Sequence, residues 1–384
     1  MTSAAAIPTA ISDPVNASIL GIAEDRLVGF LPDPLGEIAQ RSGLPVATVI
    51  ERIGAMLSAG TIRRVRQTLL ATNLAHGALV AWEVSLEKVD AAFDFLFQED
   101  PFSGHVVIRT TDTVTTGSSY RLWTTLKVPQ GYSLEKHCEF LQARIGATHF
   151  RIMPAKVLFT LGVGHVRRRG LEPGARSDVP GQPQETAIVT LSDEEWLVLG
   201  ALKREFTIDE LASNIFEQRA KEIGVPIERF YEVARDLDRR RVIGRFSTFL
   251  EHVKATGGNE RVTRYNALFH WAVPEGREFD AGCEVARHYV ITHAYWREGG
   301  PEFKNVNVMA VAHGTEKQTV LAHKAAIDEH LAEAGIAPSY TNVFWGGRSE
   351  IKPSEILPAE YRAFCTRNGL DPEAMREVLS EEPS

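Results

Sequence analysis

The sequence predicts an α+β protein built as a tandem duplication, in which each copy is a winged helix-turn-helix followed by a ferredoxin-like βαββαβ unit. Two matching pairs of segments predict the duplication. Residues 59–65 resemble residues 240–246, and residues 79–84 resemble residues 268–273, with a tryptophan at the same place in both strands. Because an internal repeat fixes which residues are equivalent, the two copies can be compared position by position.

Length and composition agree with several small domains. The chain has 384 residues, of which 44% are hydrophobic and 24% charged, enough for two to four cores. The expected divisions are a disordered leader at 1–20, a helix-turn-helix domain at 21–68, a ferredoxin-like domain at 69–169, a linker at 170–189, a second helix-turn-helix domain at 190–248, a second ferredoxin-like domain at 249–353 and a helical tail at 354–384.

Each element of the first copy follows from its residue pattern. Apolar residues keep helical spacing on both sides of a turn at 42–45, and the second helix is expected to end at Gly60. The remaining patterns alternate between extended and helical, which is the order of a split βαβ sheet. They predict strands at 79–84, 106–111, 120–127 and 149–158, and helices at 89–98 and 133–145.

Charge and cysteine content exclude several classes of protein. The net charge of −8 and pI of about 5.9 mean that the surface as a whole does not attract a polyanion, although a local basic patch could. Cys138, Cys283 and Cys365 are scattered and form no CxxC, which argues against a disulfide framework or a zinc finger. No apolar run could span a bilayer and no signal peptide is evident, so we expect a cytoplasmic protein.

The two candidate recognition helices argue against DNA binding. The helix at 46–58 carries one arginine and one glutamate and little else that could reach bases or phosphates. The helix at 227–241 is more basic, but acidic residues are mixed among its arginines. DNA is therefore an unlikely partner.

Motifs of the second copy resemble the siroheme decarboxylase family. They are an Arg-Phe segment leading to a histidine, an Arg-x-Asn-Ala strand, a Thr-His-x-Tyr-x-Arg strand and an Asn strand ending in His-Gly, which here contain Arg245, His252, Arg264, Asn266, His293, Tyr295, Arg297, Asn307 and His313. In the first copy, the strand with Arg121 and Trp123 resembles a strand of the family's partner subunit. Members are Lrp/AsnC-like proteins, either heterodimers or fused two-half chains.

The resemblance implies a carboxy-lyase of haem d1 or alternative haem biosynthesis. It would remove CO2 from acetate side chains of siroheme to give didecarboxysiroheme, without a cofactor, because the iron belongs to the substrate. His293 and His252 would be catalytic, and either could be an axial ligand to that iron. The expected substrate-binding residues are Arg245, Arg264, Asn266, Tyr295, Arg297, Asn307, His313, Arg121 and Trp123. The ferredoxin-like sheets could also mediate a homo-oligomer.

Decarboxylation of an acetate side chain requires these residue types for chemical reasons of its own. Loss of CO2 leaves electron density on a methylene carbon, which must be protonated by a group that titrates near neutral pH, as histidine does. Arginine forks suit the carboxylates that remain. His293, Tyr295 and Arg297 alternate along one strand, so their side chains should share a face. Val107 occupies the position of His293 in the first copy, which predicts one competent pocket, built mainly by the second.

Other interpretations stay open. His293 could be a core histidine and Arg297 a surface ion pair, and His252 could be an edge histidine beside a loop loosened by residues 256–261. Arg121 stands where the family usually has asparagine, and Arg109 is a further candidate for holding a carboxylate. Trp82, Trp123, Trp271 and Phe269 could line a flat ring or form core. The alternative functions are an Lrp/AsnC-type regulator that responds to haem or a metabolite, and a non-catalytic tetrapyrrole-binding protein.

Overall fold

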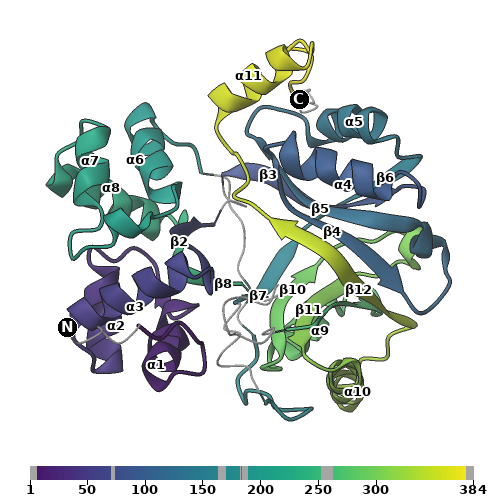
Figure 1. The fold of residues 1–384 in the computed structure, drawn as a ribbon. Helices are drawn as coiled ribbons and strands as arrows, with labels where there is room; N and C mark the ends of the chain where they lie inside the picture. The colour runs from purple at the N-terminus through teal and green to yellow at the C-terminus, as the bar shows by residue number, and fades with distance from the viewer. Residues whose placement is uncertain are drawn as a thin grey trace. The chain divides into compact units, whose positions relative to one another are not determined.

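The structure is a computed structural model that describes residues 7–70, 74–162, 170–181, 183, 189–251 and 263–377. The chain divides into two compact units (Figure 1). A helical unit contains residues 1–70, 162–171 and 189–264, and a sheet unit contains residues 71–161, 172–188 and 265–384. The helix-turn-helix parts of both copies therefore lie in one unit, and the ferredoxin-like parts of both copies lie in the other.

The helical unit pairs equivalent segments of the two copies. Its short sheet has the order β1-β8-β2, in which β2 and β8 run antiparallel and Val65 lies opposite Thr248. These strands come from the matching segments noticed in the sequence. The first copy contributes α1 (Pro14–Ala23), β1 (Leu27–Val28), α2 (Pro34–Ser42), α3 (Val46–Ser58) and β2 (Ile62–Leu69), and the second contributes α6 (Asp193–Lys203), η3 (Ile208–Glu210), α7 (Glu217–Glu222), α8 (Ile227–Arg239) and β8 (Ile243–Leu250).

The expected disordered leader at 1–20 is wrong for its second part. Helix α1 begins at Pro14, and the Asp13 carboxylate accepts hydrogen bonds from the backbone amides of Val15 and Asn16, both at 3.1 Å. An aspartate followed by proline is a favourable helix start, since the carboxylate satisfies amides that have no partner within the helix. The Ala/Pro/Ser-rich composition hid this cap.

The sheet unit confirms the ferredoxin-like prediction for both copies. The first copy runs β3 (Ala75–Glu83), α4 (Val89–Gln98), β4 (Ser103–Thr111), β5 (Tyr120–Pro129), α5 (Leu134–Ile145) and β6 (His149–Pro154). The second runs β9 (Tyr265–Ala272), α9 (Glu278–Ala286), β10 (Ile291–Trp296), β11 (Val308–Gly314), α10 (Lys317–Glu333) and β12 (Tyr340–Ile351). Two short helices, η2 (Thr116–Ser119) and η4 (Pro301–Phe303), precede β5 and β11.

The last strand of each copy crosses to the other copy. Strand β12 pairs with β9 of its own copy and then with β4, and the chain after β6 continues as β7 (Val157–Leu161), which pairs with β10. Nine strands therefore form one sheet in the order β6-β3-β5-β4-β12-β9-β11-β10-β7. The single strand expected at 149–158 is divided in two, because its second half belongs to the other copy's sheet.

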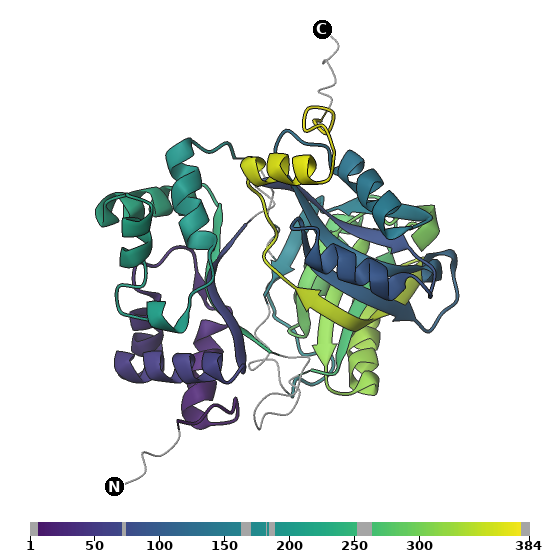
Figure 2. The ribbon, with the colours of Figure 1, turned by 45° about the horizontal axis from the view of Figure 1, so that its top comes forward.

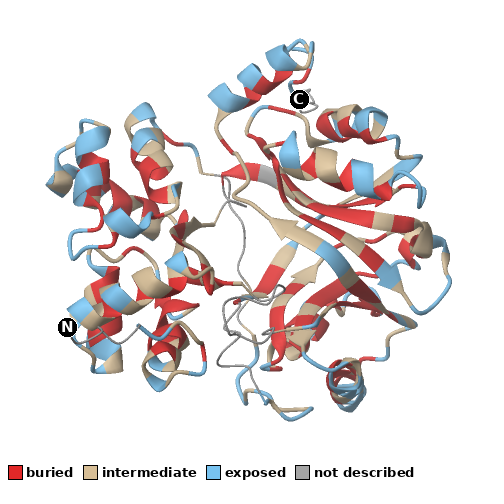
Figure 3. Cartoon of the chain, in the orientation of Figure 1, coloured by how far each residue is buried: buried red, intermediate tan, exposed pale blue. Residues whose placement is uncertain are grey.

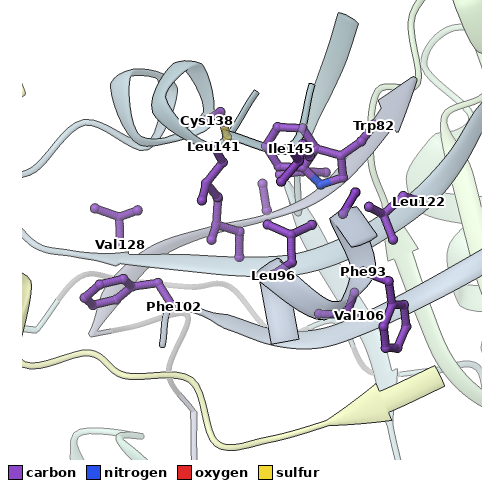
Figure 4. Packing of buried hydrophobic residues seen from close by; sticks show 14 of the residues in the cluster. Trp82, Phe93, Leu96, Phe102, Val106, Leu122, Val128, Cys138, Leu141 and Ile145 are labelled. Atoms are coloured by element: carbon purple, nitrogen blue, oxygen red, sulfur yellow. The ribbon is translucent and has the colours of Figure 1, made fainter. Parts of the chain in front are cut away.

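One face of this sheet is covered by helices. Helices α4 and α5 enclose a core around Trp82, Phe93 and Leu141 (Figure 4), which α11 (Pro358–Arg367) extends with Tyr361 and Phe364. A separate core under α9 and α10 contains Phe269 and Trp271. The buried stretches of all these strands are visible in Figure 3. Three of the four aromatic residues proposed as ring-lining, Trp82, Trp271 and Phe269, are therefore core residues that face helices.

The opposite face is shared by both copies. Its buried residues come from both copies, and they include Val107, Trp123, Leu268, Met309 and Phe344. Figure 2 shows strands of both copies running together in this unit, with the helices outside them. This shared face is the surface on which residues of the two copies can meet.

The described part of the expected linker is bound to the second copy. The Ser177 amide donates to the Arg287 carbonyl at 2.9 Å, and the Tyr289 amide donates to the Ala175 carbonyl at 3.1 Å. The arginine run at 167–169 lies outside the described residues. Within the part of the chain that the structure describes, Cys138, Cys283 and Cys365 are buried thiols without disulfides, and no helix is long and apolar enough to cross a membrane.

Gly282→Ala is expected to destabilise the sheet unit by about 1 to 3 kcal/mol. Alanine normally favours a helix interior over glycine, but a Cβ at position 282 of α9 would overlap the ring of Phe159 on β7. Urea unfolding would measure the change. Gly200→Ala in α6 is the matched control, since a Cβ there meets nothing within 4 Å, and it should stabilise. Equal effects of the two changes would contradict the close packing of β7 against α9.

Candidate functional site

Two motif residues line one face of β10, and a third follows directly after the strand. The rings of His293 and Tyr295 are stacked, with centroids 6.2 Å apart and planes 19° apart, and the Arg297 guanidinium lies 4.4 Å from the Tyr295 ring centroid. The predicted alternation of these side chains is therefore confirmed. His293 and Tyr295 are half-buried rather than enclosed in the core.

The hydrogen bonds around His293 assign its tautomer. Thr292 donates its one hydroxyl proton to the Val311 carbonyl at 3.1 Å, and the same oxygen lies 2.9 Å from His293 Nδ1. A hydroxyl has one proton to donate, so with that proton on the Val311 carbonyl, Nδ1 is the donor to Thr292 and the hydrogen of the neutral ring is on Nδ1.

Arg297 is buried rather than part of a surface ion pair. It is 8% exposed and donates a short hydrogen bond to the Met153 carbonyl of the first copy. It is also hydrogen-bonded to the Tyr295 hydroxyl, and burial lowers the pKa of Arg297 while it raises that of Tyr295. These contacts make Arg297 a group that positions Tyr295, whereas it is burial, acting against the Arg297 charge, that keeps the phenol protonated.

A row of polar residues crosses five strands beside the β10 residues. The strand register places His313 on β11 opposite Asn266 on β9, Asn266 opposite Gly346 on β12, and Gly346 opposite Arg109 on β4. The next position on β5 after the Ile108–Leu122 pair is Arg121. Paired residues point to the same face of a sheet, so candidate residues of both copies come together.

Gly346 lets the two copies approach within this row. A Cβ at position 346 would lie 3.3 Å from the Cβ of Asn266, and across this gap the Arg109 guanidinium reaches the Asn266 side-chain oxygen at 3.5 Å. Arg109 is 4% exposed and also donates to the Phe344 carbonyl at 3.4 Å. No carboxylate of the described residues pairs with it, and burial lowers its pKa to about 10. Such an arginine is suited to an anionic ligand.

His270 is a neighbour of this row that the sequence analysis did not select. It lies on the shared face of β9, fully buried among the rings of Trp123, Phe303 and Phe344. Burial, reinforced by the charge of Arg109, lowers its pKa to about 3. The sequence could have indicated this residue. Positions 266, 268 and 270 alternate along the strand, so His270 is expected on the same face as the motif residue Asn266.

The neutral state of His270 predicts a pH-dependent stability. An unfolded chain binds a proton at this residue near pH 6.5, whereas the folded protein does so only near pH 3. The free energy of unfolding should therefore fall as the pH drops from about 6.5 toward 3. Urea unfolding across this range should show a smaller decrease for His270→Leu than for wild type. Identical slopes would contradict a neutral buried His270.

Other expected site residues have structural partners. Trp123 is fully buried and donates to the Tyr120 carbonyl at 2.7 Å. It is therefore a core residue and does not face a bound tetrapyrrole ring. The Asn307 amide makes three hydrogen bonds, two to the Val273 backbone and one to Glu278, which leave it little capacity for a substrate. Arg121 donates to the carbonyls of Val84 and Ser119, at 3.5 and 3.3 Å.

Two expected residues belong to the helical unit, and a third is not described. Arg264 is exposed and precedes β9, and Arg245 lies on β8 in the helical unit. His252 lies outside the described residues. Among the described residues, no group of three or more His, Cys, Asp or Glu side chains could hold a metal ion.

Comparison with known proteins agrees with this arrangement. A family model described as an AsnC-like ligand binding domain matches residues 74–160 and 263–341, which are the two ferredoxin-like copies. A siroheme decarboxylase beta subunit from Desulfovibrio desulfuricans (strain ATCC 27774 / DSM 6949 / MB) is 32% identical over 79 residues, a match that covers 20% of this chain. The chain is thus similar to AsnC-like ligand binding domains and to a siroheme decarboxylase subunit. The match spans about half the length of that curated relative, 49%.

Solved structures of the siroheme decarboxylase family share the fold. The crystal structure of the siroheme decarboxylase NirDL superposes with a TM-score of 0.64 at 19% identity, and the alignment covers 92% of this chain and 98% of that one. NirDL in complex with an iron-uroporphyrin III analogue superposes with a TM-score of 0.62 at 18% identity, covering 92% and 99%. The fold extends over nearly the whole chain, including both copies.

Proposed function

We propose that this protein is a siroheme decarboxylase, which removes CO2 from acetate side chains of siroheme to give didecarboxysiroheme. The observation that carries the proposal is the convergence of the family's motif residues on one sheet face. His293 and Tyr295 lie there beside the row of His313, Asn266 and Arg109, which joins the two copies. Two AsnC-like ligand binding domains and the relatives named above support the same conclusion.

The proposed reaction needs only acid–base and electrostatic groups from the protein. When the acetate carboxylate leaves as CO2, the electrons of the broken C–C bond pass to the methylene carbon and delocalise into the macrocycle. His293 Nε2 then delivers a proton to that carbon, which becomes a methyl group, while Nδ1 keeps its hydrogen bond to Thr292. The iron belongs to the substrate, and no separate cofactor is required by this scheme.

The roles of the other residues follow from their contacts. Arg109 would hold a carboxylate that is retained, because its buried charge has no acidic partner among the described residues. Tyr295 would present its protonated hydroxyl beside His293, held in place by Arg297. Arg121, Asn266 and His313 complete the row from both copies. One chain would therefore supply both halves of the site, whereas the Desulfovibrio relative is a beta subunit.

The regulator alternative is not favoured by the helical unit. In α3, the one arginine, Arg52, donates to Asp13 and to Asn16. In α8, Arg229 is paired with Glu194 at 2.7 Å, and Arg239 with Asp236 at 2.9 Å. Arginines neutralised in this way are poorly placed to release counterions from DNA.

Anaerobic incubation with siroheme, followed by mass spectrometry, tests the proposal. We expect stepwise loss of the mass of one and then two carbon dioxide molecules. Binding without mass loss would instead identify a carrier or a sensor, and salt-dependent binding of duplex DNA in the same preparation would favour the sensor. Neither binding nor mass loss would refute siroheme as the substrate.

A further inference from the structure

Segment 172–181, which lies between β7 and α6 in the sequence, is attached to the turn that joins α9 to β10. The Ser177 amide donates to the Arg287 carbonyl at 2.9 Å, and the Arg287 side chain donates back to the Ser177 carbonyl at 2.8 Å. Next to this pair, Arg176 forms an antiparallel bridge with His288. His288 is 1% exposed, so the segment lies directly against a buried histidine.

His288 belongs to a chain of hydrogen bonds that has a fixed direction. Oε2 of the Glu284 carboxylate accepts from Arg287 at 2.8 Å and lies 2.9 Å from His330 Nε2, so this nitrogen carries the hydrogen of the His330 ring. In the neutral ring Nδ1 then has no hydrogen, and it accepts from His288 Nε2 at 2.9 Å. With both rings neutral, each hydrogen bond of the chain therefore has one donor and one acceptor.

Burial and positive charge both oppose an additional proton on this pair. His288 Nδ1 is buried and has no hydrogen-bond partner among the described residues, so a proton there would lack an acceptor. Burial, followed by the charges of His330 and Arg176, lowers the pKa of His288 to about 4. Burial and Arg176 also lower the pKa of His330, against the effect of Glu284. The charged or titratable groups that face the pair are Glu284 and Arg287 on α9, His323 and Glu333 on α10, and Arg176 on the segment.

Arg176 connects the protonation of the two rings to the attachment of segment 172–181. Because its charge lowers the pKa values of His288 and His330, a proton on either ring must in turn weaken the attachment of the segment that carries Arg176. An exposed histidine binds a proton near pH 6.5, whereas His288 under the segment does so near pH 4. The attachment is therefore strongest above about pH 6.5 and weakens as the pH falls toward 4.

The first copy has a carboxylate at the position equivalent to His288. Asp100 lies two residues after α4 and three before β4, as His288 does relative to α9 and β10. Asp100 is 3.4 Å from His137 Nε2, and His137 Nδ1 is 3.1 Å from the hydroxyl of Tyr361 on α11, the helix that covers this position. Burial acts to raise the pKa of Asp100, but the charge and hydrogen bond of His137 lower it overall. This carboxylate therefore stays ionised at about pH 5 and continues to hold His137.

We propose that His288 and His330 are a pH-sensitive latch, which holds segment 172–181 on the second copy while both rings are neutral and releases it when the pair gains a proton. Neither histidine belongs to the family motifs or to the polar row of the shared face. The segment is part of the chain that connects β7 of the sheet unit to α6 of the helical unit. Its release adds about ten residues, roughly 30 Å of extended chain, to that connection.

Hydrogen exchange of the full-length protein at about pH 7.5 and about pH 5, followed by mass spectrometry, tests the latch. After correction for the intrinsic effect of pH on exchange, the protection of the Ser177 and Gly181 amides, which donate to carbonyls of Arg287 and Cys283, should fall by about tenfold or more. Peptides from α11 should keep their protection, because Asp100 stays ionised. An unchanged circular dichroism spectrum would show that the fold persists.

Two variants and a control identify the groups responsible. His288→Gln keeps a donor toward His330 but does not titrate, so it should reduce the acid-induced loss of protection. Arg176→Gln should also reduce this loss, because it removes the repelling charge from an exposed side chain without changing the buried pair. Arg277→Gln is the control, since Arg277 is exposed, belongs to the same copy and is paired with Asp280 at 3.0 Å. It should show the loss of wild type.

Three results would overturn the latch. They are equal protection of segment 172–181 at the two pH values in wild type, an equal loss in peptides of α11, and an undiminished loss in Arg176→Gln. The last result decides even if His288→Gln does not fold, because Arg176 lies on the surface. None of these measurements uses siroheme, so the latch is tested independently of the proposed function.

Discussion

His293→Ala is expected to slow siroheme decarboxylation by at least about a hundredfold while leaving the dissociation constant for siroheme close to that of wild type. A positioned general acid typically contributes this much or more. The hydrogen bond from Nδ1 to Thr292 fixes the ring so that Nε2 carries the transferable proton, and alanine removes both nitrogens. Single-turnover mass spectrometry would give the rate, and an absorbance titration would give the affinity.

Two further variants make this result specific. Thr292→Val removes the acceptor of the Nδ1 proton but leaves the ring, so it should lower the rate less than His293→Ala does and change its pH profile. His149→Ala, an exposed histidine of β6 that is paired with Glu83, should have no effect. A normal rate for His293→Ala would exclude it as the proton donor, and a rate lost together with binding would indicate a holding role instead.

Arg109→Met is expected to weaken siroheme binding by about tenfold to a hundredfold, because a charge-assisted hydrogen bond to a carboxylate contributes about 1.5 to 3 kcal/mol. The same change should raise the thermal unfolding midpoint of the ligand-free protein, since a buried charge without an acidic partner is replaced by an apolar chain of similar length. Absorbance titration and thermal unfolding by circular dichroism measure the two effects.

Weaker siroheme binding together with a higher unfolding midpoint would identify Arg109 as a ligand-binding residue, because the loss of a structural arginine lowers the unfolding midpoint. Arg109→Lys keeps the charge but lacks the fork, so it should restore only part of the affinity. Arg348→Met on β12 is the matched control, because Arg348 is exposed and paired with Asp90 and Asp94, and it should leave binding unaltered. A lower unfolding midpoint with normal binding would show that Arg109 supports only the fold.

The local structure of this chain was largely predictable because its signals are local. Helical spacing, the turn at 42–45 and the alternation of residues 293, 295 and 297 each involve neighbours in sequence, and the structure bears them out. The β-α order of the copies followed from the same signals. Helix α1 was missed because one cap, Asp13 before Pro14, outweighed the composition around it.

Contacts between the copies could not be predicted in this way. Whether Arg109 meets Asn266 depends on the register of β4, β12 and β9, which no sequence spacing fixes. The pairing of β7 with β10 could not be predicted from the sequence either, because the pattern of residues 149–158 is that of one continuous strand. Trp123 was assigned to the site from a motif, but its indole is enclosed by Phe303 and Phe344, which arrive from the other copy.

Because the last strands cross between two copies encoded in one chain, equivalent positions of the two copies can carry different amino acids. In an assembly of two identical chains, every substitution appears twice, so a histidine gained at one position would also appear at its symmetry mate. Here both halves of the sheet are encoded separately, and β12 and β7 hold them in one register. Position 293 can therefore be histidine while its counterpart 107 is valine, and selection can specialise each half independently without either losing its neighbour.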